Sequence, residues 1–134
     1  MARPLLLAYQ EKDSLMNRKI LIIDDDKELS EEMVDFLTAE GYIVQAAFDG
    51  LQAEKLINKY KYDIILLDLK MPALNGIDLL KRLKKINLRT KIILISGKPF
   101  LEKELTKQGL LPMICGIVRK PYDVNKFLKT IKLI

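Results

Sequence analysis

The fold is decided by the stretch Lys61-Tyr62-Asp63-Ile64-Ile65-Leu66-Leu67-Asp68-Leu69-Lys70-Met71-Pro72-Ala73-Leu74-Asn75-Gly76. Its apolar run, residues 64–67, predicts a strand that is buried on both faces. Met71-Pro72 and Asn75-Gly76 then end the strand and open a turn into an amphipathic run. We therefore expect Asp68 at the carboxyl end of a buried strand, where open α/β sheets place their functional groups. An isolated Asp at this position is most simply a turn residue, so its role depends on the rest of the chain.

Length and composition predict one globular domain. The chain has 134 residues, of which 49% are apolar and 31% charged, and this suits a single domain with a real core. No apolar run is long enough to cross a bilayer, so we expect no membrane insertion. The net charge of +5 comes from scattered lysines without a helix-turn-helix or aromatic-basic motif. We therefore expect no direct contact with nucleic acid.

The cysteine and histidine content limits which kinds of bonds and reactions this chain can support. The single cysteine, Cys115, lies in an apolar run, and we expect it to be a small buried side chain. It cannot form an internal disulfide, which fits a reducing compartment and predicts a cytoplasmic protein. The chain has no histidine, so His general bases, His metal ligands and an internal phosphohistidine are excluded.

Residues 1–17 do not share the regular pattern that follows them. The apolar cluster Leu5-Leu6-Leu7-Ala8 is too short for a signal-peptide core, and Met16 directly precedes the first predicted strand. We interpret residues 1–17 as an N-terminal extension, either a leader or the product of an alternative start. A short helix that packs on the domain or on a partner is the other interpretation. The domain itself is expected at residues 18–134.

From Lys19 onward, strands and helices alternate. Strands are predicted at residues 20–23, 42–47, 64–67, 91–95 and 113–118. The helices that follow them are predicted at about 29–40 with a cap at Gly41, then at 51–60, 76–86, 99–108 and 124–131. Parallel strands need crossover connections, and these are right-handed. Five such units predict an α/β fold with one parallel sheet and helices on both faces.

Polar side chains follow the ends of four predicted strands. They are Asp24 and Asp25, Asp68, Ser96, and Lys120. The carboxyl ends of parallel strands share one edge of the sheet, so we expect these side chains to converge. Carboxylates in such a cluster repel one another unless a hard cation is present, and Mg²⁺ suits oxygen ligands. Lys120 would then offer a positive charge to an incoming anion.

Helix capping is the alternative explanation for some of these residues. Asp26 alone, or Asp25 together with Glu28, could cap the first predicted helix. Ser96 could likewise be a helix N-cap or a turn residue. Convergence at the sheet edge and local capping make different predictions about where these side chains lie.

Four spaced motifs support a more specific interpretation. They are Ile22-Ile23-Asp24-Asp25-Asp26, Leu66–Pro72 with Gly76, Ile95-Ser96-Gly97, and Val118-Arg119-Lys120-Pro121. Together with the segment from Ala46 to Gly50, they resemble the receiver domain of two-component response regulators over residues 18–134. The resemblance implies a flavodoxin-like (βα)5 fold, a doubly wound parallel sheet of five strands in the order 2-1-3-4-5.

The resemblance also implies a role for each residue of the predicted cluster. Asp68 matches the phosphoacceptor, and Ser96 and Lys120 match the groups that bind phosphoryl oxygens. Asp25 matches a direct Mg²⁺ ligand and Asp24 one that acts through water. The full set of implied metal ligands is Asp24, Asp25, Asp68 and the backbone carbonyl of Lys70.

The function implied by the resemblance is a phosphorylation-activated signalling module and not an enzyme. Its phosphoryl donor would be a sensor histidine kinase, a histidine phosphotransfer protein or a small acyl phosphate, and its downstream effector is not identified. A partner would recognise the conformational change caused by phosphorylation on the helix at 99–108, the strand at 113–118 and the last helix. Ile117 stands where the family has an aromatic residue, which argues against an aromatic-rotamer switch. The segment 110–115 departs from the family's small Gly-Ala pattern and is either a partner surface or a reshaped loop.

Two other classes of function agree less well with these residues. A protein-binding module that works without phosphorylation would have no need for the acids, Asp68, Ser96 and Lys120. An enzyme with a nucleotide site would need a Gly-rich or Ser/Thr-rich loop after the first strand, where this chain has three aspartates. A haloacid-dehalogenase-like phosphatase would need a second Asp at position 70, which is Lys.

Overall fold

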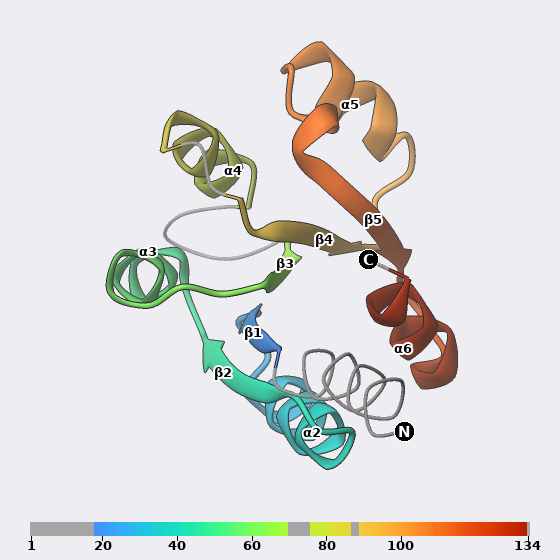
Figure 1. Ribbon diagram of the computed structural model, residues 1–134. Coiled ribbons are helices and arrows are strands. Elements are labelled where there is room, and N and C mark those ends of the chain that lie inside the picture. Colours follow the sequence, from blue (N-terminus) through green and yellow to red (C-terminus); the bar gives the residue numbers. More distant parts are fainter. Residues whose placement is uncertain (1–17, 70–75, 87–88, 134) are drawn as a thin grey trace, which may run out of the picture.

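The computed structural model describes residues 18–69, 76–86 and 89–133. Its centre is a sheet of five parallel strands: β1 (Lys19–Ile23), β2 (Ile43–Ala47), β3 (Ile64–Asp68), β4 (Lys91–Ser96) and β5 (Ile114–Arg119). Their order is β2-β1-β3-β4-β5 (Figure 1). The predicted α/β class and the flavodoxin-like strand order are therefore confirmed.

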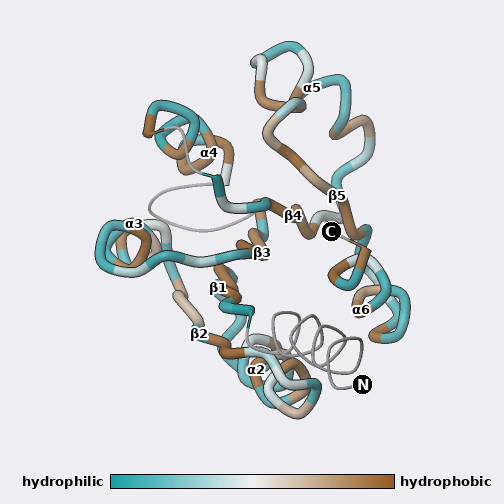
Figure 2. The backbone as a smooth tube through the Cα atoms, in the orientation of Figure 1, coloured by the Kyte–Doolittle hydropathy of each residue, from teal (hydrophilic) through white to brown (hydrophobic). Residues whose placement is uncertain are grey.

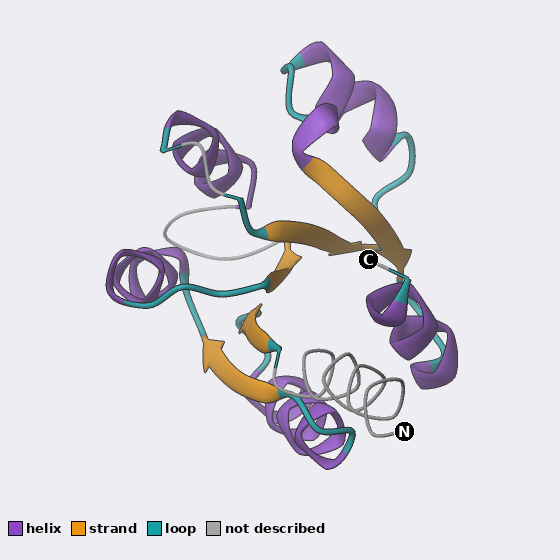
Figure 3. Cartoon of the chain, viewed as in Figure 1, coloured by secondary structure: helices purple, strands orange, loops and turns teal. Residues whose placement is uncertain are grey.

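Helices cover both faces of this sheet (Figure 3). They are α2 (Lys27–Ala39), α3 (Gly50–Lys59), α4 (Gly76–Lys85), α5 (Leu101–Lys107) and α6 (Val124–Lys132), with a short 3-10 turn η1 (Leu111–Met113) before β5. Helices α2 and α6 pack on one face, and α3, α4 and α5 pack on the other. None of the described helices is long and apolar enough to span a membrane.

The central strands are buried because their side chains alternate between two apolar layers. In β1, Leu21 and Ile23 join the layer under α3, α4 and α5, whereas Ile20 and Ile22 join the layer under α2 and α6. All five residues of β3 are buried. Figure 2 shows the same arrangement, with apolar residues along the central strands. Continuous apolar runs of this kind are typical of parallel strands that are covered on both faces.

The prediction for Cys115 was wrong, because this side chain is exposed. In the pairing of β5 with β4, Ile92 lies opposite Ile114 and Ile93 lies opposite Gly116. Cys115 is therefore the additional residue of a β-bulge, which leaves the ladder and bends the strand. The bulge lies on an edge strand, where such irregularities are common, and an apolar run in the sequence does not reveal it.

Glycine is required at position 76, where α4 begins. A Cβ added to Gly76 would lie 2.5 Å from Leu69 Cα and 2.7 Å from Leu69 Cδ2. The Gly76 N–H also donates a hydrogen bond to the Leu69 carbonyl (3.0 Å), so the two backbones cannot separate without losing this bond. This contact ties the start of α4 to the end of β3.

We expect Gly76→Ala to lower the free energy of unfolding by about 2 kcal/mol, the range of an overpacked site. Urea denaturation followed by circular dichroism measures this difference. Gly97→Ala is the matched control, because the nearest atom to its added Cβ is Lys120 Cβ at 3.7 Å. Equal stability of the two variants would contradict the proposed backbone clash.

Two predictions lie outside the described residues. The N-terminal extension, residues 1–17, is one of them, and the domain boundary at residue 18 stays a prediction. The other is the backbone carbonyl of Lys70, which was expected to be a metal ligand.

Candidate functional site

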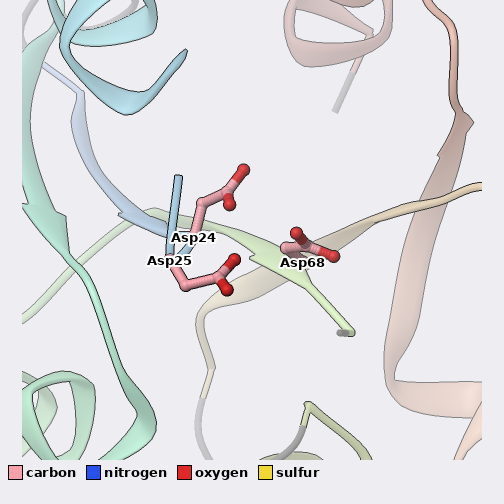
Figure 4. Close-up of side chains that lie close together, drawn as sticks. All are labelled: Asp24, Asp25 and Asp68. Carbon is pink, nitrogen blue, oxygen red and sulfur yellow. The ribbon is translucent and has the colours of Figure 1, made fainter. Parts of the chain in front are cut away.

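Three carboxylates meet at the carboxyl edge of the sheet. Asp24 and Asp25 follow β1, and Asp68 is the last residue of β3. Strands β1 and β3 are direct neighbours, with Ile23 opposite Leu67, so the residues that follow come side by side. One carboxylate oxygen of each aspartate lies within 4.8 Å of the other two, and Figure 4 shows the grouped side chains. The predicted convergence of these carboxylates is present.

Burial makes this cluster electrostatically unfavourable without a cation. Asp24 is 3% exposed and Asp68 4%, whereas Asp25 is exposed. The pKa of Asp24 is raised from 3.8 to about 6, mainly by burial and also by the charge of Asp68. The hydrogen bond from the Asp26 N–H to Asp24 Oδ1 (3.0 Å) and the charge of Lys120 oppose this rise. A carboxylate with a raised pKa beside two others gains from a bound positive charge.

Lys120 follows the edge strand β5 and extends toward this cluster. Its Nζ lies 3.1 Å from Asp68 Oδ2, although 52 positions separate the two residues. The backbone N–H of Lys120 donates to the Ser96 carbonyl (3.0 Å), which fixes the residue beside the end of β4. The Asp68 side chain is 5% exposed and that of Lys120 37%. The Lys120 side chain is therefore partly open to solvent, from which an incoming anion can approach it.

Ser96 ends β4 and is buried next to the cluster. Its Oγ accepts a hydrogen bond from the Lys98 N–H (3.0 Å). Ser96 does not cap α5, because the N-cap of that helix is Phe100, which makes no side-chain cap bond. A cavity of about 980 Å³ has Asp68, Ser96 and Lys120 in its wall. These three side chains therefore share one space that an incoming group can enter.

Capping accounts for only one member of the acidic run. Asp26 Oδ1 accepts a hydrogen bond from the Leu29 N–H (3.0 Å) and is the N-cap of α2. Asp24 and Asp25 instead belong to the carboxylate cluster. Capping is thus confirmed for Asp26, whereas Asp24 and Asp25 lie in the cluster with Asp68.

The described carboxylates fit a hard divalent cation. They supply only oxygen atoms, and an oxygen set with room for water is what Mg²⁺ prefers over softer metals. The raised pKa of Asp24 is a second indication, because burial and the charge of Asp68 both disfavour its ionised form and a bound cation would favour it. Asp24, Asp25 and Asp68 are the residues that would hold it.

Sequence reasoning missed two residues beside this site. Lys98 holds the Ser96 hydroxyl through its backbone N–H, a contact that any residue type could make and that no motif reveals. Tyr122 has a buried Oη without a hydrogen-bond partner among the described residues. Burial raises the pKa of Tyr122, and so do the charges of Asp24 and Asp68. In the sequence, only its position two residues after Lys120 indicated that Tyr122 lies near the site.

Comparison with known proteins identifies the class. A model of the response regulator receiver domain matches residues 20–132. Sporulation initiation phosphotransferase F of Bacillus subtilis is 34% identical over 120 residues, which are 88% of this chain and 94% of that protein. The solved receiver domain of Francisella response regulator 1452 is 33% identical with a TM-score of 0.78, covering 87% of this chain and 95% of that one. The chain therefore belongs to the response regulator receiver domain family of two-component systems.

Other similar proteins show the range of the family. Response regulator TrrA of Thermotoga maritima, solved in complex with Mg²⁺ and beryllium fluoride, is 25% identical with a TM-score of 0.75 and covers 87% of this chain and 97% of that one. Several curated relatives are transcriptional regulators, and this chain spans about half of their length. The resemblance stated from the motifs is confirmed, and the protein is a signalling domain.

Proposed function

We propose that this domain is switched by phosphorylation of Asp68. The observation that carries the proposal is the contact between Lys120 Nζ and Asp68 Oδ2 at 3.1 Å beside two further carboxylates. A buried carboxylate with a cation on one side and metal ligands on the other suits phosphoryl transfer, which depends on positioning and charge neutralisation. A role limited to protein binding does not require this arrangement.

In the proposed reaction, an Asp68 carboxylate oxygen attacks the phosphorus atom of the donor. The bond between phosphorus and the donor breaks, and its electron pair leaves with the donor group. Lys120 and the Ser96 hydroxyl bind the oxygens of the transferred group. Mg²⁺ held by Asp24, Asp25, Asp68 and the Lys70 carbonyl would supply the charge that neutralises these oxygens.

The proposed donor is a phosphohistidine on another protein, because this chain has no histidine. We propose a sensor histidine kinase or a histidine phosphotransfer protein in this role, in the cytoplasm. The new group carries about two negative charges and would draw Ser96 and Lys120 toward Asp68. A partner would recognise this rearrangement on α5, β5 and α6. Because position 117 is Ile, no aromatic side chain at that position would take part in the rearrangement.

Intact-mass measurement after incubation with acetyl phosphate and Mg²⁺ tests the proposed phosphorylation. We expect one added phosphoryl group that requires the metal and disappears in Asp68→Asn. Asp35→Asn is the matched control, because Asp35 is an exposed acid on α2 and its loss should leave the added mass in place. An unmodified wild-type protein, or a modified Asp68→Asn variant, would contradict the proposal.

A further inference from the structure

Another cavity lies at the edge of the sheet where the strands begin. It has a volume of about 640 Å³, and its wall includes Arg18 before β1, Asp63 before β3 and Lys91 at the start of β4. Asp68 is the last residue of β3, so the proposed phosphorylation site lies at the opposite edge. Pockets that hold small ligands have volumes in this range. The cavity is therefore a candidate binding site that is separate from the acidic cluster.

The wall of this cavity carries most of the net positive charge of the protein. Among the described residues, it contains the acid Asp63 and five cations, which are Arg18, Lys59, Lys61, Arg89 and Lys91. These six residues have a net charge of +4. The rest of the chain holds the remaining 18 basic and 17 acidic residues, a net charge of +1. Like charges around one cavity repel one another, and a bound anion would remove this repulsion.

Four of these cations take part in none of the ion pairs among the described residues. They are Lys59, Lys61, Arg89 and Lys91, and all four are exposed. The carboxylate of Asp63 accepts a hydrogen bond from the Lys19 N–H (2.8 Å), so the backbone already uses part of its capacity. The positive charge of the cavity wall is therefore available to a ligand.

Hydrogen bonds hold the backbone around the cavity in place. The Asp63 N–H donates to the Lys19 carbonyl (2.8 Å), and the Lys91 N–H donates to the Asp63 carbonyl (3.0 Å). The Thr90 hydroxyl donates to the Tyr62 carbonyl (2.7 Å). The loop before β3 is thus connected both to β1 and to the start of β4. Because this backbone is already ordered, a ligand does not have to order it on binding.

An aromatic surface lies beside these charges. Tyr60 is part of the cavity wall and is 42% exposed. Its ring lies 6.5 Å from that of Tyr62 at an interplanar angle of 70°, and Lys59 Nζ lies 5.4 Å from the Tyr60 ring centroid. The buried side chains of Ile57 and Ile65 add apolar surface to the wall. An aromatic ring next to cations suits a ligand that has both a planar base and phosphates.

We propose that this cavity binds a nucleotide, with the phosphates among the five cations and the base against Tyr60. The described cations surround one cavity, whereas proteins that bind a nucleic-acid strand carry a positively charged groove that follows the strand. A single nucleotide therefore fits the arrangement better than a strand. The proposal is independent of the proposed function, because none of these residues belongs to the proposed phosphorylation site.

Isothermal titration calorimetry with ATP as the probe, in the presence of a metal chelator, tests the proposal. We expect ATP to bind with an affinity that falls as salt is added. The double variant Lys61→Gln with Lys91→Gln should weaken binding about tenfold, because each lost exposed ion pair accounts for a few fold. No binding of ATP, or unchanged binding in this variant, would overturn the proposal.

The matched control is the double variant Lys103→Gln with Lys107→Gln. Both are exposed lysines of α5 outside the cavity wall, so the net charge changes equally while ATP binding should change less than about twofold. An equal loss of affinity in the two double variants would overturn the assigned site, because it would show a response to net charge alone.

Tripolyphosphate tests the contribution of the base, because it carries the phosphates alone. We expect it to bind about tenfold more weakly than ATP, the size of one stacked base. Tyr60→Leu should remove this difference by weakening the binding of ATP and leaving that of tripolyphosphate unchanged. Tripolyphosphate that binds as tightly as ATP to the wild type would overturn the nucleotide in favour of an inorganic polyanion. Tighter binding of a single-stranded DNA oligonucleotide would overturn it in favour of a nucleic-acid surface.

Discussion

Metal-free protein that carries Asp24→Asn is expected to be more stable than the wild type at pH 7, by about 3 kcal/mol of unfolding free energy. The reason is the pKa of Asp24, which burial raises from 3.8 to about 6. Asparagine keeps an oxygen that can accept the hydrogen bond from the Asp26 N–H, but it carries no charge. Urea denaturation followed by circular dichroism in the presence of a chelator measures the difference.

The sign of the pH dependence follows from the direction of this pKa shift. Because the pKa of Asp24 is higher in the folded protein, its contribution to stability is fully present below pH 3.8 and is lost as the pH rises through about 6. Wild type and Asp24→Asn should therefore have similar stabilities near pH 4 and should diverge between about pH 4 and 7. Asp35→Asn, at an exposed position on α2, should show no such divergence.

Added Mg²⁺ should reverse the order of the two proteins. A ligand that binds only the folded state stabilises it by mass action, and the wild type offers three carboxylates within 4.8 Å of one another. The Asp24→Asn variant lacks one of them and should gain much less from the metal. A metal-free variant that is less stable than wild type at pH 7 would show that burial of Asp24 carries no penalty. Equal stabilisation of both by Mg²⁺ would remove Asp24 from the metal site.

The sheet and the convergence of its strand-end residues could be predicted because both depend on regular patterns. Apolar runs marked the central strands, and parallel pairing then required Asp24, Asp68 and Lys120 to lie along one edge. The contact between Lys120 and Asp68 crosses 52 positions, and the topology explains why both residues lie at the same edge of the sheet. Roles within the site came from the resemblance to receiver domains, because a turn, a cap and a metal ligand can all use the same aspartate.

The features that could not be predicted depend on local geometry that has no pattern in the sequence. The bulge at Cys115 is a single irregular residue in the pairing of β4 with β5, and it turned a predicted core side chain outward. The pair of Arg119 with Glu102 depends on where α5 begins relative to β5, which side-chain periodicity does not determine. The orphan hydroxyl of Tyr122 depends on how α2 and α6 pack.

Two of these features, the bulge and the pair of Arg119 with Glu102, lie on β5 and α5 at one edge of the sheet. Burial on both faces fixes the position and register of the central strands, so they can move little. The edge formed by α5, β5 and α6 is anchored in the core by buried apolar side chains, but its outer surface carries exposed ion pairs and one bulged strand, and such surface features change at a lower cost than the core does. A signalling domain needs a rigid site and a surface that responds to it, and this chain separates the two along the sheet.

Phe127→Ala is expected to lower the free energy of unfolding by about 3–5 kcal/mol, the cost of removing a buried phenylalanine. Phe127 is fully buried, with 0% exposure, in the layer between the sheet and helices α2 and α6. Its ring stacks on Tyr122 with a centroid distance of 5.4 Å, and Tyr122 lies two residues after Lys120. A loss of this size is a large part of the roughly 5–15 kcal/mol that stabilises a typical domain.

Phe100→Ala separates burial from the removal of an aromatic ring as such. Phe100 is 73% exposed, so its loss should change stability by less than about 0.5 kcal/mol, as for other surface substitutions. Both variants are measured by urea denaturation, where an unchanged slope shows that the midpoint reports stability. If Phe127→Ala costs no more than Phe100→Ala, then α6 is not anchored through this ring. The segment that carries Lys120 would then have to be held in place by β5 alone.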